Sequence, residues 1–258
     1  MSAGAAWGGA RRLANLKHVC ELLSTGAVAR VRPDGQTGTM ATSETQGRKR
    51  RGEYRAGRDT RESLMVAAER LFAEHGLDAV SLREIAVEAG SRNSGAAQYY
   101  FGSKAELLRA VLEFRSQALN RRRRQLLEAA GECPDVYALL VALVVPLAEM
   151  VGHTHYVSFL ARLQAEYARD RRSINAGGEV DTSFRRAQTL LAAALPQLPP
   201  ERFRLRFRLV MRMAIATLGE HERHPDGERL GTSALIEEII DAAAGLMLAP
   251  SGQAGTES

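Results

Sequence analysis

The sequence predicts an all-α fold. From residue 59 onward, apolar residues recur at helical spacing, polar helix-starting residues precede several of these stripes, and glycines follow them. Only the Phe-Arg-Leu-Arg-Phe run that begins at Phe203 alternates like a strand. Pro199 and Pro200 before the run, and the apolar stripe that continues after it, favour a helix there as well.

Composition narrows the class of protein. The chain has 258 residues, enough for one large domain or two smaller ones, and its net charge of +5 weakly favours a polyanionic partner. Cys20 and Cys133 lie far apart in sequence and form no metal or redox motif, which is typical of a reducing compartment. Since no apolar run reaches the roughly 18 residues of a membrane helix, we expect a cytoplasmic protein without membrane contact.

Residues 1–57 are predicted to form a disordered N-terminal extension, because they are rich in Gly, Ala, Ser and Arg and show little periodicity. Met40 is a natural start for a protein. Residues 1–39 are therefore either an upstream extension that the cell does not translate or a true disordered tail.

A basic run closes this extension. The segment "GRKRRGEYRAGR", residues 47–58, holds six basic residues and one acid, a local charge of +5. Such a run is either a solvated tail or an arm that follows phosphates or enters a minor groove.

Two helices are expected next. The first begins at Asp59, which forms a capping-box pattern with Glu62, and Gly76 is a natural stop. The second begins at Ser81, which forms the same pattern with Glu84. The apolar positions that define the two stripes are Leu64, Ala68, Leu71 and Phe72, then Leu82, Ile85, Ala86 and Ala89.

Two further helices follow Gly90. Ser103 and Glu106 form a third capping-box pattern at the start of a long helix. Between Gly90 and Gly102, in "GSRNSGAAQYYFGSK", there is room only for a short helix from about Ser94 to Tyr100. Two short helices joined by a tight turn and braced by a third are typical of a helix-turn-helix unit.

The short helix has the residues that a DNA-recognition helix needs. Gln98 could bind adenine edges, and the ring of Tyr99 or Tyr100 could contact a thymine methyl while its hydroxyl reaches a phosphate. Lys104 lies at a helix N-terminus, where backbone N–H groups favour a phosphate, and Ser81 has a similar position. The alternative is that the Tyr-Tyr-Phe triplet is core packing. We expect only Phe101 to turn inward.

These segments resemble the TetR family of bacterial transcriptional regulators. The matching stretches are "AAERLFAEHGLDAVSLREIAVEAG" and "GAAQYYFGSKAELL", within residues 59–115. One departure is an extra residue between Gly90 and Phe101, which indicates a subgroup with a Gln-Tyr-Tyr-Phe recognition helix. The departure leaves open which of Arg92, Asn93 and Ser94 reaches the bases.

The resemblance implies an architecture and a function. It implies a helix-turn-helix domain over residues 58–118, a helical effector-binding and dimerisation domain over 119–250, and a disordered tail over 251–258. It implies a homodimeric repressor that binds a palindromic operator in double-stranded DNA and is released by a small-molecule effector. The alternative is a ligand-independent activator or architectural protein. The DNA contacts implied are Ser81, Arg83, Arg92, Asn93, Ser94, Gln98, Tyr99, Tyr100 and Lys104.

The sequence shows no nucleophile–base motif, phosphate loop or paired carboxylates in a glycine-rich loop, so we expect neither an enzyme nor a bound cofactor. His221 and His224 lie three residues apart, but their place at a helix end does not favour a metal site.

Several amphipathic helices are expected in the C-terminal half. By the resemblance, the last two pair with a second subunit, and the central ones enclose an effector pocket. The candidates for polar groups of that pocket are His153, Tyr156, Arg162 and Glu166, although each is more readily explained as a partly exposed helix residue. The operator, the effector and the regulated genes cannot be deduced from the sequence.

Overall fold

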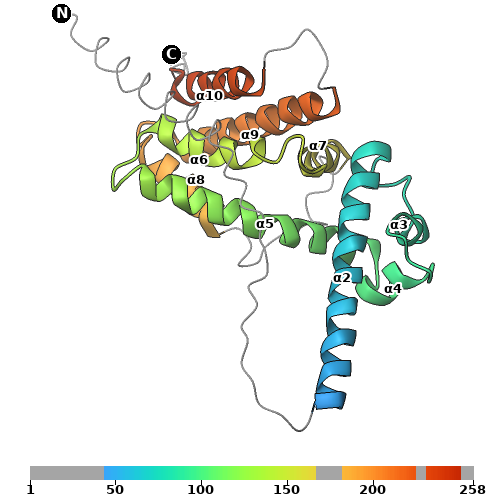
Figure 1. Ribbon diagram of the computed structural model, residues 1–258. Helices are drawn as coiled ribbons and strands as arrows, with labels where there is room; N and C mark the ends of the chain where they lie inside the picture. Colours follow the sequence, from blue (N-terminus) through green and yellow to red (C-terminus); the bar gives the residue numbers. More distant parts are fainter. Residues whose placement is uncertain (1–43, 167–181, 225–230, 251–258) are drawn as a thin grey trace, which may run out of the picture.

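The computed structural model describes residues 44–166, 182–224 and 231–250, and every regular element in these ranges is an α-helix (Figure 1). The predicted all-α fold is therefore confirmed for this part of the chain. The helices are α2 Glu44–His75, α3 Leu82–Glu88, α4 Ala96–Phe101, α5 Lys104–Ala129, α6 Val136–Ala148, α7 Tyr156–Glu166, α8 Thr182–Ala193, α9 Pro200–Arg223 and α10 Thr232–Leu248.

The first described helix, α2, begins much earlier than expected. It starts at Glu44, so the predicted helix start at Asp59 is wrong and the expected domain boundary at residue 57 falls inside a helix. Asp59 acts as an interior residue, because its carbonyl accepts a hydrogen bond from the hydroxyl of Ser63 one turn later, at 2.9 Å. The remainder of the expected extension, residues 1–43, and the expected tail, residues 251–258, lie outside the described residues.

The predicted helix ends around α3 are confirmed. Ser81 and Glu84 form a complete capping box, in which the Glu84 carboxylate accepts from the Ser81 N–H at 2.7 Å and the Ser81 hydroxyl accepts from the Glu84 N–H at 3.2 Å. Gly76 and Gly90 follow α2 and α3 with φ of 86° and 69°, a backbone region that favours glycine.

The third predicted capping box is only half formed. The Ser103 hydroxyl accepts a hydrogen bond from the backbone N–H of Glu106 at 3.2 Å. The carboxylate of Glu106 pairs instead with Arg109 one turn along α5. Ser103 therefore caps α5 without help from the acidic side chain.

Helices α2 to α5 share a small hydrophobic core. Leu64 and Phe72 from α2 are fully buried, as are Leu77 after α2, Ile85 from α3 and Leu107 from α5. This core fixes the short helices α3 and α4 against one side of α2, while the N-terminal half of α2 extends past them (Figure 1).

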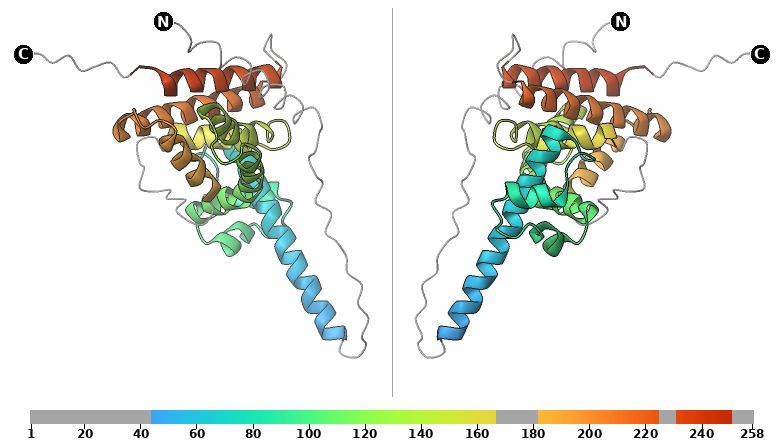
Figure 2. Two further views of the ribbon diagram at one scale, coloured as in Figure 1. Left: turned by 90° about the vertical axis from the view of Figure 1, so that its left-hand side faces the viewer. Right: turned by 90° about the vertical axis from the view of Figure 1, so that its right-hand side faces the viewer.

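The C-terminal half is a helical bundle capped by a layer of two helices. In both views of Figure 2, α10 forms the outermost layer and α9 lies directly beneath it. Helix α6 is almost wholly buried, and Pro146 lies inside it without ending it. Helix α7 packs between α9 and the C-terminal end of α2, so it connects the two halves of the molecule.

The alternating Phe-Arg run lies within α9, as the flanking prolines predicted. Side chains of α9 bond to both ends of α10. Arg206 donates to the carbonyls of Met247 at 3.0 Å and Ala249 at 2.7 Å, which satisfies the C-terminal end of α10. His221 is buried and lies 3.0 Å from the hydroxyl of Thr232. No helix in the described ranges is long and apolar enough to cross a membrane.

Candidate nucleic-acid interface

Helix α4 starts from a turn built by its own side chains. The amide oxygen of Asn93 accepts a hydrogen bond from the Gly95 N–H at 2.9 Å, and the Ser91 hydroxyl donates to the Asn93 carbonyl at 3.0 Å. The helix begins at Ala96, two residues after the predicted start at Ser94, because this turn occupies the preceding residues. It also continues one residue beyond the predicted end, through Phe101.

The two faces of α4 differ sharply. Ala96, Ala97 and Phe101 are buried against the rest of the N-terminal unit, so the prediction that Phe101 turns inward is confirmed. On the other side Tyr99 is 82% exposed and packs edge-on against Tyr100, with 5.3 Å between ring centroids. A helix of six residues thus presents a large aromatic side chain to solvent while it remains anchored from behind.

The early part of α2 lies beside α4. A Cβ atom added to Gly57 would lie 3.5 Å from the hydroxyl oxygen of Tyr100, and the guanidinium of Arg61 lies 5.0 Å above the ring of Phe101. The basic run at residues 47–58 belongs to the segment of α2 that projects beyond α3 and α4 in Figure 1. Because the run was expected to be disordered, its position beside α4 was not predicted.

Four of the predicted DNA-binding side chains already have partners within the protein. The amide of Gln98 donates to the Gly102 carbonyl, and the hydroxyl of Ser81 caps α3. The Asn93 amide oxygen supports the turn before α4. Lys104 lies 3.4 Å from the Asp78 carbonyl and 5.9 Å from the centroid of the Phe72 ring.

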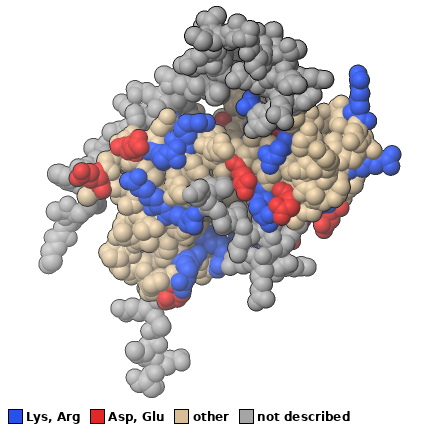
Figure 3. Space-filling model, turned by 90° about the horizontal axis from the view of Figure 1, so that it is seen from below, with Lys and Arg blue, Asp and Glu red and all other residues tan. Residues whose placement is uncertain are grey.

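The remaining predicted contacts are available to a ligand. The side chains of Arg83, Arg92, Ser94 and Tyr99 are exposed, and that of Tyr100 is half-buried. Seen from below, Lys and Arg side chains lie among Asp and Glu side chains rather than in one basic patch (Figure 3). The shape of α4, more than the charge of the described surface, therefore defines the candidate interface.

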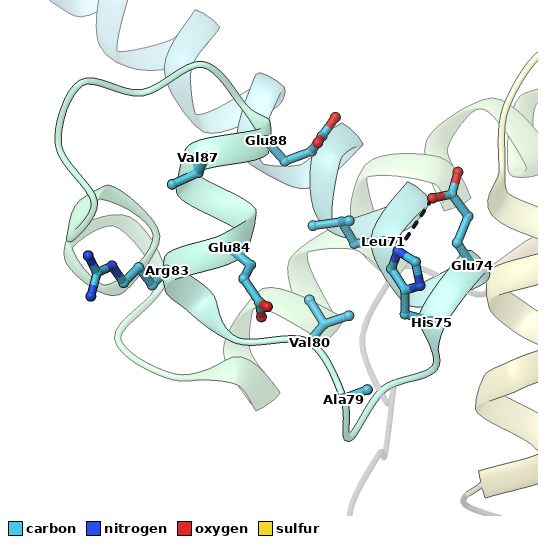
Figure 4. Close-up of a pocket in the computed structure, with 9 residues that line it drawn as sticks. All are labelled: Leu71, Glu74, His75, Ala79, Val80, Arg83, Glu84, Val87 and Glu88. Atoms are coloured by element: carbon cyan, nitrogen blue, oxygen red, sulfur yellow. Dashed lines mark ion pairs between the residues drawn. The ribbon is translucent and has the colours of Figure 1, made fainter.

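An open groove of about 860 Å³ lies between the C-terminal end of α2 and α3 (Figure 4). Its carboxylates are Glu74, which lies 3.7 Å from the imidazole of His75, and Glu84 and Glu88 on α3. Hydrogen bonds from Ser81 lower the pKa of Glu84, which favours its charged form. Arg83 also lines the groove, and its side chain extends from α3 away from Leu71 and His75 in Figure 4.

The four predicted effector-pocket residues do not meet in one place. Tyr156 is buried and lines an interior cavity, whereas His153 lies on the surface in a groove beside α2. Arg162 and Glu166 lie at the junction of α7 with α2. Arg162 donates to the Ala73 carbonyl at 3.4 Å, and Glu166 accepts from the backbone N–H of Leu77 at 2.9 Å.

The interior cavity has a volume of about 230 Å³ and is lined by residues of α5, α6, α7, α8 and α9. Its walls are mostly aliphatic and aromatic, with a polar edge formed by Ser116, Asn120 and Arg123 on α5 and by Gln164 on α7. Arg123 was not among the predicted pocket residues. It stands in a run of four arginines, and only the packing of α5 turns this one inward.

Two family models match the chain, one in the N-terminal unit and one in the C-terminal bundle. Residues 64–111 match the family model described as bacterial regulatory proteins, tetR family, and residues 138–249 match the one described as tetracyclin repressor-like, C-terminal domain. No curated protein matches the sequence.

Solved structures of transcriptional regulators are similar to the chain. A transcriptional regulator from Rhodococcus sp. Rha1 is 22% identical, with 73% of this chain and 95% of that chain covered and a TM-score of 0.50. For a tetR-family transcriptional regulator from Streptomyces coelicolor, the identity is 22%, the coverage 73% of this chain and 80% of that chain, and the TM-score 0.45.

The two family matches together take in more than half of the chain, in the order in which the two halves of the fold occur. The sequence-based expectation that the chain is not an enzyme agrees with this result, since the family consists of transcription regulators. The protein belongs to the TetR family and is a DNA-binding transcription regulator.

Proposed function

We propose that this regulator is a homodimeric repressor that binds a palindromic operator and is released by a small molecule. Repression and effector release are typical of the family. The observation that carries the DNA-binding part is the exposure of Tyr99, 82%, on a short helix whose opposite face is buried. A large aromatic side chain held outward by a rigid helix is suited to contact base edges in a major groove.

The proposed contacts divide into two groups. Gln98 and Tyr99 face the bases, which requires the Gln98 amide to exchange its Gly102 partner for an adenine edge. Arg92 and Ser94 extend this surface from the turn before α4. The phosphate contacts are proposed for Ser81, Arg83, Asn93, Tyr100 and Lys104. The Gln-Tyr-Tyr-Phe sequence of α4 would then define a subgroup with its own operator preference.

Dimerisation is proposed to occur through α9 and α10. Helix α10 is the outermost helix in Figure 2 and α9 lies beneath it, and the two expose Leu205 and Leu209 on α9 and Leu248 on α10. Gly245 has open space around its Cα, so a second helix could approach α10 closely there. A twofold dimer places two copies of α4 on successive major grooves and so requires a palindromic operator.

The effector site is proposed to be the interior cavity lined by Tyr156, within an effector-binding domain over residues 119–250. Arg162 and Glu166 are proposed to transmit the effect, because they bond to backbone atoms at the C-terminal end of α2. An effector that favours one arrangement of α7 would shift α2, and with it the helix-turn-helix domain at 58–118. His153 is on the surface and is not assigned to the cavity.

A second candidate function is a ligand-independent activator or architectural protein. The basic segment of α2 supports it, since a charged helix beside α4 would add sequence-independent phosphate contacts. Either function places the protein with the DNA, in the cytoplasm of a bacterium.

The decisive experiment is fluorescence anisotropy of the full chain on DNA from upstream of its own gene. Scrambled DNA of equal length serves as the comparison at several salt concentrations. The Gln98→Ala, Tyr99→Ala double variant tests α4, and Glu128→Ala, an exposed position at the far end of α5, is the matched control.

Preference for the upstream DNA that is lost only in the double variant supports the proposal. Equal binding to both DNAs with a steep salt dependence contradicts sequence-specific repression and supports the architectural alternative. Specific binding that no small molecule weakens would leave the ligand-independent activator.

A further inference from the structure

We infer that the interior cavity takes an uncharged molecule of one aromatic ring with a hydroxyl group, and that Ser116 accepts a hydrogen bond from this hydroxyl. The inference rests on the proposed function in treating this cavity as the effector site. It is carried by the hydrogen bond that Ser116 already makes, by the composition of the walls, and by the volume of the cavity.

Ser116 is a buried polar residue of the cavity wall whose proton is already used. The residue is 6% exposed, and its hydroxyl donates to the carbonyl of Glu113, in the preceding turn of α5, at 2.8 Å. A serine hydroxyl has one proton to donate and two lone pairs that accept. Because the proton is directed to Glu113, the oxygen can act toward a ligand only as an acceptor. The ligand group that meets Ser116 must therefore be a donor, such as a hydroxyl.

Most of the remaining wall is aliphatic. The aliphatic and thioether side chains are Leu112 and Leu119 from α5, Leu147 from α6, Leu160 from α7, and Met211 and Ile215 from α9. Such a wall favours the apolar body of a ligand, because burial removes apolar surface from water. A charged group that entered here would lose its hydration without an equivalent replacement.

Aromatic side chains and the cavity volume favour a single ring. The rings of Tyr156 and Phe184 line the cavity together with the thioether of Met211. Aromatic rings pack edge-on or offset against one another, and thioethers make favourable contacts with ring edges. The volume of about 230 Å³ lies below the range of roughly 300–1,000 Å³ for drug-sized ligands. One substituted ring therefore matches both the walls and the size.

Arg123 also lines the cavity, but its guanidinium is held by the protein. The Nε atom donates to the carbonyl of Ala142 at 3.2 Å, and Nη1 lies 3.2 Å from the hydroxyl of Ser183. The guanidinium lies 5.4 Å from the centroid of the Phe184 ring. A carboxylate ligand would have to compete with these groups for Nε and Nη1, and would also lose its hydration. We therefore expect an uncharged ligand to be preferred over an acid of the same shape.

The test is isothermal titration calorimetry of the full chain with three probes of similar shape. 4-Methylphenol carries the hydroxyl, p-xylene has a methyl group in its place, and 4-methylbenzoate has a carboxylate. Ser116→Ala removes the proposed acceptor. Ser63→Ala is the matched control, because the Ser63 hydroxyl donates to a carbonyl one turn earlier, at 2.9 Å, on an exposed part of α2.

A second variant tests the location of the site without changing Ser116. Leu160→Trp narrows the cavity from a half-buried position on α7. All probes that bind the wild type should bind this variant more weakly, since a larger side chain occupies part of the volume.

We expect Ser116→Ala to weaken 4-methylphenol binding by about fivefold and to leave p-xylene binding unchanged, as the loss of one hydrogen bond predicts. Ser63→Ala should leave both unchanged. 4-Methylbenzoate should bind the wild type about tenfold or more weakly than 4-methylphenol.

Four results would each overturn the inference. They are equal weakening of 4-methylphenol and p-xylene by Ser116→Ala, 4-methylbenzoate binding as tight as that of 4-methylphenol, undiminished binding to folded Leu160→Trp, and no binding of 4-methylphenol to the wild type.

Anisotropy on operator DNA separates this inference from the proposed function. 4-Methylphenol that binds through Ser116 without weakening DNA binding would contradict effector release and leave the inference standing. Release of DNA by a charged compound, with 4-methylphenol not bound, would support an effector-released repressor and contradict the inference.

Discussion

The carboxylate of Glu69 on α2 is 1% exposed and binds Arg115 on α5 through two hydrogen bonds, from Nε at 2.6 Å and from Nη2 at 3.0 Å. The same carboxylate accepts from the backbone N–H of His155 at 3.1 Å. One acidic side chain therefore joins the first described helix, the long helix α5 and the residue that precedes α7. This junction lies where the N-terminal unit meets the C-terminal bundle.

Removing this carboxylate should destabilise the protein. Glu69→Ala leaves Arg115 and the His155 N–H without their acceptor, and because Arg115 is partly accessible to water we expect a loss of about 2–3 kcal/mol, at the low end for broken buried pairs. Urea denaturation followed by circular dichroism measures the loss. Glu106→Ala, which breaks an exposed pair on α5, should cost ~1 kcal/mol or less. Equal losses in the two variants would contradict this account of the junction.

The stability cost of substituting Gly76 should depend on the side chain of Glu166. A Cβ at Gly76 would meet Oε1 of Glu166 at 2.8 Å, in addition to the penalty of φ 86°, whereas Gly90 has φ 69° and nothing within 4 Å. Gly76→Ala should therefore cost about 1 kcal/mol more than Gly90→Ala, because it also displaces Glu166 from the Leu77 N–H.

Thermal denaturation of the two single variants tests this difference. In a Glu166→Ala background the excess cost of Gly76→Ala should disappear, since the side chain that it displaces is gone. An excess that persists in this background would show that contacts other than Glu166 limit the space at Gly76.

The pH dependence of stability that Glu222 contributes should be opposite to that of an acid whose pKa is lowered in the folded state. Burial, the largest cause, raises the pKa of Glu222 above its ordinary value, although its carboxylate accepts from the Ser158 N–H at 2.8 Å. A raised pKa in the folded state means that the folded protein holds the proton more tightly than the unfolded chain. The stability contributed is present below the ordinary pKa and is lost as pH rises through the folded pKa.

Replacing Glu222 with Gln should remove this pH dependence. The free energy of unfolding of Glu222→Gln, relative to the wild type, should increase from about pH 4, near the ordinary carboxyl pKa, to about pH 8. Denaturant titrations at a series of pH values measure it, with Glu201→Gln at an exposed position of α9 as the control. A relative stability that falls over the same range would contradict the raised pKa.

Formation of the proposed dimer should depend on the exposed leucines of α9. Leu205→Glu and Leu209→Glu together place two charges on a face of α9 that dimerisation would bury, so we expect monomers and at least tenfold weaker operator binding. Sedimentation equilibrium measures the oligomeric state. Val87→Glu, at a 64% exposed position on α3, should leave it unchanged. A dimer that survives both charges would place the interface elsewhere.

The basic segment of α2 should govern the salt dependence of DNA binding. The triple variant Arg50→Gln, Arg51→Gln, Arg55→Gln should weaken binding to operator and scrambled DNA alike. The slope of log affinity against log salt should decrease by about one for each phosphate contact that is lost. Anisotropy at four salt concentrations provides the slope. An unchanged slope would indicate that these arginines remain solvated when DNA is bound.

Features that depend on neighbours in sequence were predicted well. The capping box at Ser81 and the glycine stops after α2 and α3 each involve residues within one turn, so a short stretch of sequence contains the whole interaction. The helical spacing of apolar residues likewise predicted the amphipathic helices of the C-terminal half, including α9, because burial of one face is what stabilises them.

Two predictions from local sequence patterns were wrong, because a longer helix or a different side-chain contact formed instead. Asp59 has the sequence of a helix start, but the helix continues through it to Glu44, because the preceding basic residues are also good helix formers. Glu106 has the spacing of a capping box, but its carboxylate pairs with Arg109. A pattern states which contact is possible, and competition among contacts decides which one forms.

The sequence by itself determined the fold class and the presence of a short helix between Gly90 and Gly102, since both follow from periodicity and from motifs confined to a few turns. The tertiary structure alone decided which arginine of a run of four enters the core, and that Glu166 and Arg162 contact the end of α2 rather than the cavity. These outcomes depend on how helices distant in sequence pack, and the burial of apolar faces that drives this packing is non-directional, so no short segment encodes its result.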